Sequence, residues 1–432
     1  MHDNVDINID QLSKTEGHAD LQVKVRNGKV EDVKLKISEN KRFYTQAVRK
    51  RHYSSIPQFV SRICGTCSIA HLTCSIKAVE KCFNIQPSEQ TQILRKLSVY
   101  GMMIRDHALH LYFFCLPDIF GKDSIFDFDE SKDALIKQAF AVKSVGNNLS
   151  KVIAGRAVHP TFQKIGHFSH IPSKEEIKDM INQLKNTREY VFELIDIFYN
   201  SNFEFTRETN FISLISNDYS FLEGEILTSG GLKIKEEDFW TYLERIVIPY
   251  SQATGFKFST NEYMVGALAR MNLSRDKLSK VSKKDLSSQY LKIFPSNNIY
   301  HNNLAQAIEI LHCIDHSIQL LEENGFKSEL PPKITFKGEG EGEEKRGIGV
   351  IEAPRGTLYH NLDISKDSKV TYANFVIPTA QNQIKMENDI RLLLPRILNR
   401  SKHEIHHELE KVIRAYDPCM SCASHFLKLK WI

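Results

Sequence analysis

Two cysteine motifs near opposite ends of the chain, RICGTC at residues 62–67 and DPCMSCASH at residues 417–425, indicate how the protein folds. Each contains a Cys-x-x-Cys pair, made by Cys64 and Cys67 and by Cys419 and Cys422. Two intervening residues let the backbone fold over one ion, so that both sulfurs of a pair can bind it. Thiolates are soft ligands that suit zinc, iron–sulfur clusters and other thiophilic metals. We therefore expect a four-thiolate metal site that joins two distant segments.

The separation of the two pairs argues against a small zinc module. In such modules the metal holds a short segment folded, whereas here 352 positions separate Cys67 from Cys419. The fold itself must therefore bring the pairs together. The spacing alone leaves two interpretations open, a structural zinc site and a catalytic or redox metal site.

The composition is that of an ordinary soluble protein. The 57 Lys and Arg residues barely exceed the 53 Asp and Glu residues, and a formal charge of +4 does not favour nucleic acid as a partner. No run of about 20 apolar residues occurs, because the most apolar candidate, residues 109–120, contains His110 and Asp118. The amino terminus has neither the basic region nor the apolar core of a signal peptide. We therefore predict a cytoplasmic protein without a membrane span.

In the reducing cytoplasm, Cys-x-x-Cys spacing indicates metal or redox chemistry rather than a disulfide. Four further cysteines lie outside the paired motifs, and as small apolar residues they are expected in the core. They are Cys74, Cys82, Cys115 and Cys313.

Alternation of apolar and polar residues predicts small antiparallel sheets towards both ends of the chain. Residues 21–25 and 33–37 alternate around an Asn-Gly pair at residues 27–28, which indicates a β-hairpin with one buried face. Strand-like segments return at residues 347–352 and 370–377.

Helical periodicity dominates the middle of the chain. Ser173 and Glu176 form a capping-box pattern ahead of apolar residues at helical spacing. A second strong helix is predicted over residues 304–321, and a final helical stretch, rich in His and Arg, over residues 388–414. The Gly- and Glu-rich residues 337–347 cannot pack a core and are expected to form a flexible loop or a solvated hairpin tip.

These patterns predict an α+β protein that is mainly helical, with a large helical bundle and small antiparallel β-sheets at the amino terminus and near the carboxy-terminal third. No linker or repeat divides the chain, so residues 1–432 are expected to form one domain. Residues 1–40 would be its β segment and residues 41–330 its mainly helical region with the first cysteine motif. Residues 331–432 would hold further β segments, a carboxy-terminal helix and the second motif.

The residues around the cysteines narrow the choice of metal. Arg62 and His71 flank the first pair, and Asp417 and His425 flank the second. Further stretches in the same order are EGH at residues 16–18, GRAVHP at 155–160, EAPRGTLYH at 352–360 and PTAQN at 378–382. Together these motifs resemble the large subunit of the nickel–iron hydrogenases, and within it the soluble, cofactor-coupled cytoplasmic branch. The resemblance covers nearly the whole chain and implies the fold of that subunit.

The resemblance implies the catalytic subunit of a hydrogenase, an oxidoreductase that interconverts H2 with protons and electrons. Its cofactor would be a centre of nickel and of iron that carries carbon monoxide and cyanide. Cys64 and Cys419 would be terminal nickel ligands. Cys67 and Cys422 would bridge nickel to iron. Sulfur suits this role because a soft, electron-rich donor stabilises the changing charge of nickel.

Four polar residues would carry protons or charge around this centre. Glu16 matches the glutamate that hydrogen-bonds Cys419 and passes protons outward, as expected of a carboxyl beside a metal thiolate. Arg355 matches an arginine over the open side of the metals, where its positive charge would orient hydrogen and nearby carboxylates. Asp106 and Asp417 match the acids that pair with this arginine, although Asp417 could equally cap the turn before Cys419.

Further residues match positions that surround the diatomic ligands. Pro354 would pack against these ligands, and Thr379, which follows Pro378, would hydrogen-bond one cyanide. His71 would donate to a bridging sulfur and so tune the metal potential.

The second motif also implies an accessory magnesium-like ion near His425. Many relatives supply a glutamate for this ion nineteen residues before the first cysteine, where this chain has Thr45. A neutral hydroxyl is a poor replacement for a carboxylate towards a hard dication. Waters and a backbone carbonyl, such as that of Phe375, would have to complete the site.

The expected partners follow from the electron-transfer groups that the chain lacks. Once the four site cysteines are used, no iron–sulfur binding set remains in the sequence, so electrons would leave through an iron–sulfur small subunit. Further subunits would pass them to a nicotinamide, a deazaflavin or a sulfur compound. Maturation factors would insert the metals, and the short tail at residues 426–432 would either be removed by a protease or remain.

Two other interpretations stay open. The quinone-binding subunit of respiratory complex I shares the fold but generally lacks the metal cysteines, all of which are present here. A zinc-stabilised scaffold without catalysis would account for the thiolates, but it gives no reason for Glu16, Arg355 and Asp106 in matching contexts.

Overall fold

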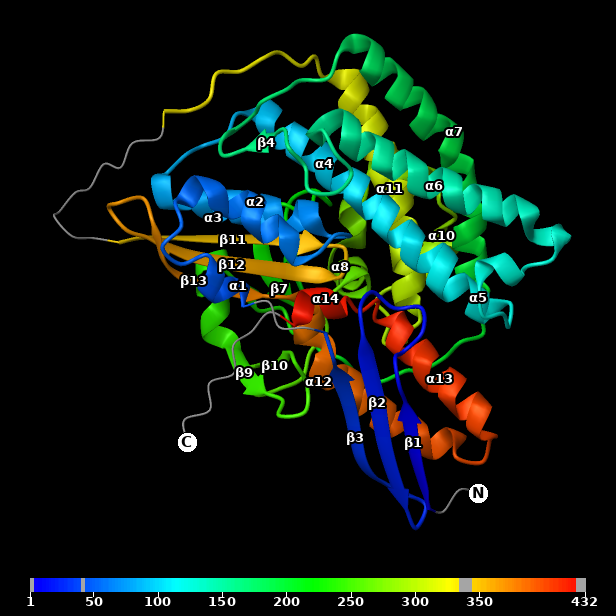
Figure 1. Ribbon diagram of the computed structural model, residues 1–432. Helices are drawn as coiled ribbons and strands as arrows, with labels where there is room; N and C mark the ends of the chain where they lie inside the picture. Colours follow the sequence, from blue (N-terminus) through cyan, green and yellow to red (C-terminus); the bar gives the residue numbers. More distant parts are fainter. Residues whose placement is uncertain (1–3, 40–42, 334–343, 425–432) are drawn as a thin grey trace.

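The computed structural model describes residues 4–39, 43–333 and 344–424. Figure 1 shows a bundle of long helices, a central sheet covered by α3, and an amino-terminal sheet beside the last helices. The helices are α1 (Tyr44–Ala47), α2 (Ile56–Val60), α3 (Ser68–Phe83), α4 (Glu89–Ala108), α5 (Leu116–Ile119), α6 (Asp133–Ala154), α7 (Lys174–Tyr199), α8 (Ala267–Ser274), α9 (Lys280–Asp285), α10 (Ser288–Lys292), α11 (His301–Glu323), α12 (Pro378–Ile397), α13 (Lys402–Ala415) and α14 (Met420–Ala423). The strands are β1 (Val5–Ile9), β2 (Ala19–Arg26), β3 (Lys29–Ile37), β4 (Gln163–Lys164), β5 (His167–Phe168), β6 (Ile212–Ile215), β7 (Glu225–Thr228), β8 (Lys233–Ile234), β9 (Leu243–Val247), β10 (Thr254–Phe258), β11 (Lys345–Ala353), β12 (Gly356–Ile364) and β13 (Val370–Val376).

The helical bundle consists mainly of α4, α6, α7 and α11, which pack against one another (Figure 1). The predicted capping box starts α7: the Ser173 hydroxyl accepts the backbone N–H of Glu176, and the Glu176 carboxylate accepts the N–H of Ser173. The helix predicted over residues 304–321 is α11. Both helix predictions are confirmed.

The amino-terminal sheet contains the predicted hairpin, β2–β3, joined by a tight turn. Asn27 and Gly28 have φ of 50° and 68°, the conformation that a two-residue hairpin turn requires. β1 pairs with β2 and is not predicted by the sequence pattern. β3 also bonds to α12, because Gln383 donates to the Leu35 carbonyl (3.1 Å) and Glu387 accepts the Leu35 N–H (3.0 Å). These bonds fix the sheet on the helical body.

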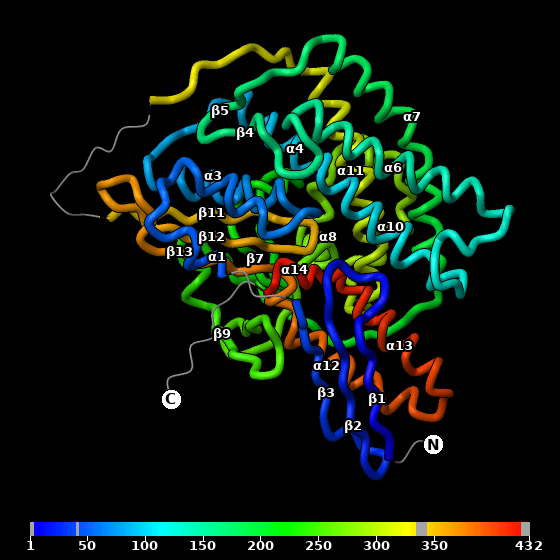
Figure 2. Tube along the Cα trace, in the orientation of Figure 1, coloured from blue at the N-terminus to red at the C-terminus, as the bar shows by residue number. Residues whose placement is uncertain are grey.

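The two ends of the described chain lie side by side, with the blue amino-terminal strands next to the red α13 and α14 in Figure 2. The backbone N–H of Ser13 donates to Glu410 of α13 (2.9 Å). The N–H of Met420, in α14, donates to the carbonyl of Glu16 (2.8 Å). The segment that carries Glu16 is therefore attached directly to the second cysteine motif.

The central sheet, β11–β12–β13, is antiparallel and carries α3 on one face. β11 approaches the backbone of α3 through Gly347 and Gly349: a Cβ at Gly349 would lie 2.2 Å from the carbonyl oxygen of Cys74. α3 begins directly after Cys67, and β11 ends at the turn that carries Arg355. The close approach thus fixes the first cysteine pair relative to Arg355.

Three parts of the sequence prediction need correction. The strand β12 is not predicted by the sequence pattern. The helix predicted over residues 388–414 is instead two helices, α12 and α13, because Ser401 and Glu404 form a capping box that starts α13. The loop predicted over residues 337–347 falls largely outside the described residues, and its last three residues belong to β11. The mainly helical α+β fold with small antiparallel sheets is confirmed.

Buried apolar side chains form one cluster that runs through the described parts of the chain, from Val5 to Ala423. The four cysteines outside the paired motifs are buried, as expected: Cys74, Cys82, Cys115 and Cys313. None of the helices in the described ranges is long and apolar enough to cross a membrane.

Gly349→Ala is expected to lower the free energy of unfolding by about 1–3 kcal/mol, because the added methyl group overlaps the α3 backbone. Chemical denaturation followed by circular dichroism measures this change. Gly325→Ala is the control, since a Cβ at Gly325 meets no described atom within 4 Å. Equal stability of the two variants would contradict the packing of β11 on α3.

Candidate metal centre

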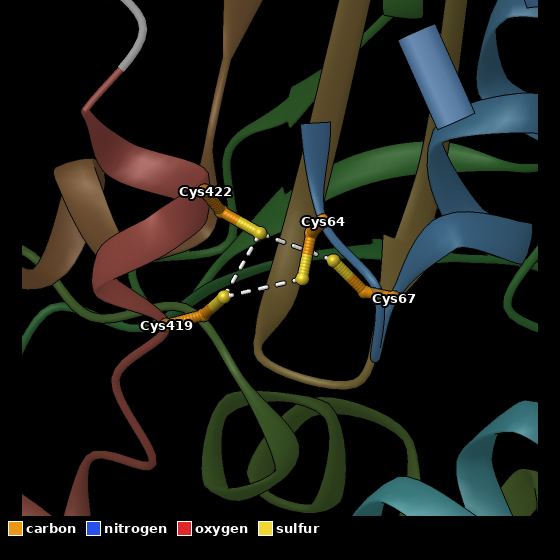
Figure 3. Close-up of side chains that lie close together, drawn as sticks. All are labelled: Cys64, Cys67, Cys419 and Cys422. Carbon is orange, nitrogen blue, oxygen red and sulfur yellow. Dashed lines mark hydrogen bonds between the residues drawn. The ribbon is translucent and has the colours of Figure 1, made fainter. Parts of the chain in front are cut away.

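The four motif cysteines meet in one buried cluster, as the sequence predicts. Their sulfurs all lie within 4.8 Å of one another. The Sγ–Sγ distances are 2.9 Å for Cys419–Cys422, 3.1 Å for Cys67–Cys422 and 3.4 Å for Cys64–Cys419. Figure 3 shows the four side chains pointing toward one another from two separate chain segments.

Each cysteine pair is placed by a helix that begins inside its motif. Cys64 is extended and follows the short turn η2 (Ser61–Ile63), and Cys67 immediately precedes α3. Cys419 immediately precedes α14 in the same way. The amino end of α3, a helix of 16 residues, therefore lies directly beside Cys67.

Four thiolates packed this closely need a cation. Hydrogen bonds from the other three cysteines hold the pKa of Cys64 well below its usual value. Burial raises the pKa of Cys419 and of Cys422, and the hydrogen bond with Cys419 raises that of Cys67. The protein alone therefore stabilises one negative charge in the cluster, and a bound metal is required to deprotonate the rest.

A small cavity of about 10 Å³, room for about one water-sized molecule, adjoins the sulfurs. Three of the four cysteines line it, and Cys64 does not belong to the described lining. Its wall also contains five residues that the sequence assigns to the site: His71, Pro354, Arg355, Pro378 and Thr379. The cluster is thus open on one side to a space for small molecules or small metal-bound ligands.

Arg355 lies at this cavity, in the two-residue turn between β11 and β12, and is 5% exposed. Its Nη1 is 2.9 Å from a carboxylate oxygen of Asp106, and its Nη2 is 3.0 Å from one of Asp417. The structure therefore places both predicted acids against this arginine. The buried Nε of Arg355 has no hydrogen-bond partner among the described residues, which leaves one donor for a group in the cavity.

Asp417 adopts a left-handed conformation, with φ of 50°, directly before the second cysteine pair. Its carboxylate binds Arg355 and also accepts a hydrogen bond from Nε2 of Gln306 (2.9 Å). These described bonds pair Asp417 with other side chains and do not show it capping the turn before Cys419. Gln306 is itself held by Nδ1 of His110, 2.5 Å from its side-chain oxygen. Gln306 and His110 were missed by the sequence analysis, because no local pattern marks a contact between α11 and the segment after α4.

Arg105, beside Asp106 on α4, is a second residue that sequence reasoning missed. Its Nη2 donates to the backbone carbonyl of Thr66, at 2.5 Å, between the two cysteines of the first motif. Burial lowers the pKa of Arg105. The bond fixes the first motif to the helix that supplies the partner of Arg355.

Glu16 lies next to Cys419 through backbone pairing, since the two residues form an isolated parallel bridge. Gly17 permits this approach: its φ is +85°, and a Cβ there would lie 2.8 Å from the backbone nitrogen of Ser421. Burial, followed by the negative charge of Cys64, raises the pKa of Glu16 to about 7. A carboxyl with such a pKa can both hold and release a proton near neutral pH.

Comparison with known proteins identifies the family. The model of the nickel-dependent hydrogenase family matches residues 42–164 and 239–425, more than half of the chain. The chain belongs to this family. Within it, the sulfhydrogenase 2 subunit alpha of Pyrococcus furiosus is 32% identical over 426 residues, which cover 98% of this chain and 100% of that protein.

Other hydrogenases match at lower identity. The NAD-reducing hydrogenase HoxS subunit beta of Cupriavidus necator is 25% identical over 468 residues, covering 97% of this chain and 94% of that protein. A solved NAD+-reducing NiFe hydrogenase in the H2-reduced state superposes with a TM-score of 0.85 at 24% identity, covering 98% and 99% of the two chains. The shared fold is that of hydrogenase large subunits, and the chain is an oxidoreductase that acts on hydrogen.

The residues of this hydrogenase fit a nickel–iron centre. Four soft thiolates lie within reach of one metal, and burial leaves them in need of positive charge. A small cavity adjoins three of the sulfurs, and the buried Nε of Arg355, a residue of its wall, has no hydrogen-bond partner among the described residues. A closed structural zinc site would use neither feature, so the zinc scaffold is not favoured. The complex I relative is disfavoured as well, because all four cysteines converge.

The wall of the hydrogenase cavity opposite α3 is formed by the start of α12. Pro378 is its first residue, and the hydroxyl of Thr379 accepts the backbone N–H of Cys419 at 2.9 Å. Since the Thr379 oxygen accepts this bond, its hydrogen can still be donated into the cavity. Nδ1 of His71 lies 3.2 Å from Nε2 of His360, and the bond predicted from His71 to a bridging sulfur stays a prediction.

The accessory ion site of this hydrogenase is only partly described. His425 lies outside the described residues. Thr45 is 9% exposed in α1, which packs against β13, the strand that contains Phe375. The predicted ion at His425 stays a prediction.

Thr379→Val is expected to lower the free energy of unfolding of the metal-free protein by about 1–3 kcal/mol, because the buried N–H of Cys419 loses its acceptor. Thr379→Ser keeps the hydroxyl and is the matched control. Denaturant titration measures both variants. A valine variant as stable as the serine variant would show that this bond does not hold the second motif.

Proposed function

We propose that the chain is the catalytic large subunit that splits H2 heterolytically at a nickel–iron centre, and that its own residues take up the proton and hold the centre in place. The observation that carries this proposal is the four-sulfur cluster open to a cavity whose wall contains a charged, partly unpartnered arginine. The family match supports the same reaction. The organisation of residues 1–432 as one domain belongs to this proposal and is supported by the continuous core.

The four cysteines would divide into two roles. Cys64 and Cys419 would bind nickel alone, and Cys67 and Cys422 would bind nickel and iron together. The cavity adjoins Cys67 and Cys422, where an iron with carbon monoxide and cyanide would need space, but it also adjoins Cys419. The division into two roles therefore rests on the resemblance of the two motifs. When bound, the nickel–iron centre supplies the cleavage of H2 and the storage of its electrons.

Glu16 would accept the proton that H2 cleavage releases on the Cys419 side of the site. Its backbone contact with Cys419 and its pKa of about 7 support this role. The next acid outward is Glu39, which accepts the backbone N–H of His18 (2.9 Å) and is partly exposed. A proton that leaves the Glu16 carboxyl would thus travel toward the surface along the amino-terminal segment.

The other cavity residues would orient and enclose the reactants. Arg355 would hold a fixed positive charge over the cavity, with Asp106 and Asp417 setting the direction of its side chain. Pro354 and Pro378 would exclude water, and the hydroxyl of Thr379 would donate to a cyanide. His71 would tune the potential through a bridging sulfur, and His425 would bind an accessory dication such as magnesium.

The chain would act within a larger assembly in the cytoplasm. Both relatives described above are named as subunits, so each is one part of a multisubunit hydrogenase. An iron–sulfur small subunit would receive the electrons, since the described residues provide one cysteine cluster and it is used by the active site. Further subunits would reduce a nicotinamide, a deazaflavin or a sulfur compound, and maturation factors would insert nickel and iron.

Protein matured in its native host is expected to contain nickel and iron and to show infrared bands of bound carbon monoxide and cyanide. Cys419→Ser is expected to lose the nickel and all H2 oxidation, because a serine hydroxyl is a hard and weakly acidic ligand. Elemental analysis and infrared spectroscopy measure both proteins, with Cys313→Ser, a core cysteine, as the control. Zinc without nickel or diatomic bands in the wild type would refute the proposed function.

Glu16→Gln is expected to retain the metals but to slow hydrogen–deuterium exchange by about 100-fold or more, because the amide cannot accept and release the proton. Exchange is followed by mass spectrometry of the gas phase. Glu410→Gln is the control, since Glu410 binds Ser13 on the same segment and pairs with Arg414, whereas Glu16 is the residue that pairs with Cys419. An exchange rate in Glu16→Gln equal to that of this control would reject the proton relay.

A further inference from the structure

Two backbone carbonyls at the turn that carries Arg355 accept hydrogen bonds from outside its hairpin. Ala353 pairs with Gly356, so Pro354 and Arg355 form a two-residue loop at the tip of β11 and β12. The carbonyl oxygens of Ala353 and Pro354 each accept a hydrogen bond from Arg270, at 3.0 Å. The position of the Arg355 backbone therefore depends on a side chain from another element, α8.

Arg270 is 2% exposed, and each of its donors is used. A guanidinium has five N–H groups in a rigid plane. Nε and Nη2 donate to the two oxygens of Glu309 (2.6 and 2.7 Å), and Nη1 donates to Glu352 (2.9 Å). The remaining two N–H groups bind the two turn carbonyls. Five bonds in one plane leave the guanidinium a single position, and the turn is fixed to it.

Glu309 in α11 is the anchor of this arrangement. It is fully buried and accepts hydrogen bonds from Nε2 of His107 (2.8 Å) and from the hydroxyl of Tyr219 (2.6 Å). Although burial opposes ionisation, the charge of Arg270 lowers the pKa of Glu309 to about 2. His107 is the neighbour of Asp106 on α4, so the same network reaches the helix that supplies the partner of Arg355.

Glu352 completes the support from within the hairpin. One of its oxygens accepts the backbone N–H of Leu214 (2.8 Å) and the hydroxyl of Thr357 (2.7 Å), and the other accepts Arg270. The carboxylate thus binds both strands of the hairpin on either side of the turn. The tip cannot shift without breaking buried, charge-assisted bonds, which are the strong class of hydrogen bond.

We propose that Arg270 is a positioning residue for H2 activation, which sets the place of the Pro354–Arg355 turn relative to the four cysteines through the carbonyls of Ala353 and Pro354. The inference rests on the proposed function. Arg270 does not line the cavity in the described structure and acts only through the turn. Pro354 lines the cavity beside Arg355, so a displaced turn would alter both the charge and the wall next to the metals.

The test is Arg270→Lys in the complete, metal-loaded hydrogenase. A lysine keeps the charge but has no planar fork, so it cannot bind Glu309 and both carbonyls together. The expected result is unchanged nickel and iron content, shifted infrared bands of carbon monoxide and cyanide, and a loss of about 10-fold to 100-fold in both hydrogen–deuterium exchange and H2 oxidation. Equal loss in both assays locates the defect at the metals rather than in electron transfer.

Arg95→Lys is the matched control, because Arg95 is also buried and forms a two-bond ion pair with Glu80. Arg95 lies on α4, about 16 Å along the helix from Asp106. This control variant is expected to keep the wild-type bands and exchange rate. If Arg270→Lys does not fold, Glu309→Gln replaces it: the isosteric amide weakens the anchor of Arg270, and the same bands are expected to shift.

If the folded Arg270→Lys variant keeps the wild-type infrared bands and exchange rate, the inference is overturned and the proposed function stays intact. The same holds for Glu309→Gln if the lysine variant does not fold. Shifts of the same size in Arg95→Lys would also overturn it, because the effect would then belong to any buried ion pair. A wild-type protein without diatomic bands would instead overturn the proposed function, before any variant is compared.

Discussion

The convergence of four cysteine sulfurs within 4.8 Å is the constraint on which the rest of the structure depends. The two pairs belong to segments at opposite ends of the chain, so no local element can form the site. Burial without a cation disfavours more than one thiolate in the cluster, as the raised pKa values of Cys419 and Cys422 indicate. The fold must therefore assemble an electrostatically unfavourable group, and a metal must complete it.

Three connections hold the sulfurs in place. β11 lies on the backbone of α3 and so relates Cys67 to the turn of Arg355. Arg355 binds Asp106 of α4 and Asp417 of the second motif. Removal of one partner from a buried ion pair of this kind costs about 3–5 kcal/mol, because a charge is left unpaired in a medium of low dielectric constant. Buried ion pairs contribute little net stability, so the effect of these interactions on the site is mainly the geometry that they impose.

The sequence predicts the residues that meet at the four-sulfur cluster and fails on those that support them. The cysteines, Arg355 and Asp417 could be identified because each stands in a short motif. The hairpin at residues 27–28 and the start of α7 also have local signatures. Arg270, Gln306 and Arg105 have none, because they act through contacts between elements that are far apart in the sequence. The division between α12 and α13 was predictable, since Ser401 and Glu404 form a recognisable capping box.

The bond between Met420 and Glu16 has a consequence for the synthesis of the chain. The ribosome completes the first cysteine pair 352 positions before it reaches Cys419. At 5–20 residues per second, this interval lasts about 20–70 s. Throughout it, Cys64 and Cys67 are bare thiols on an unfinished protein, and the amino-terminal segment has no partner to close on. The metal centre is therefore a late product of biosynthesis, and oxidation or capture of the first pair during that interval would leave a fully translated protein unable to close its site.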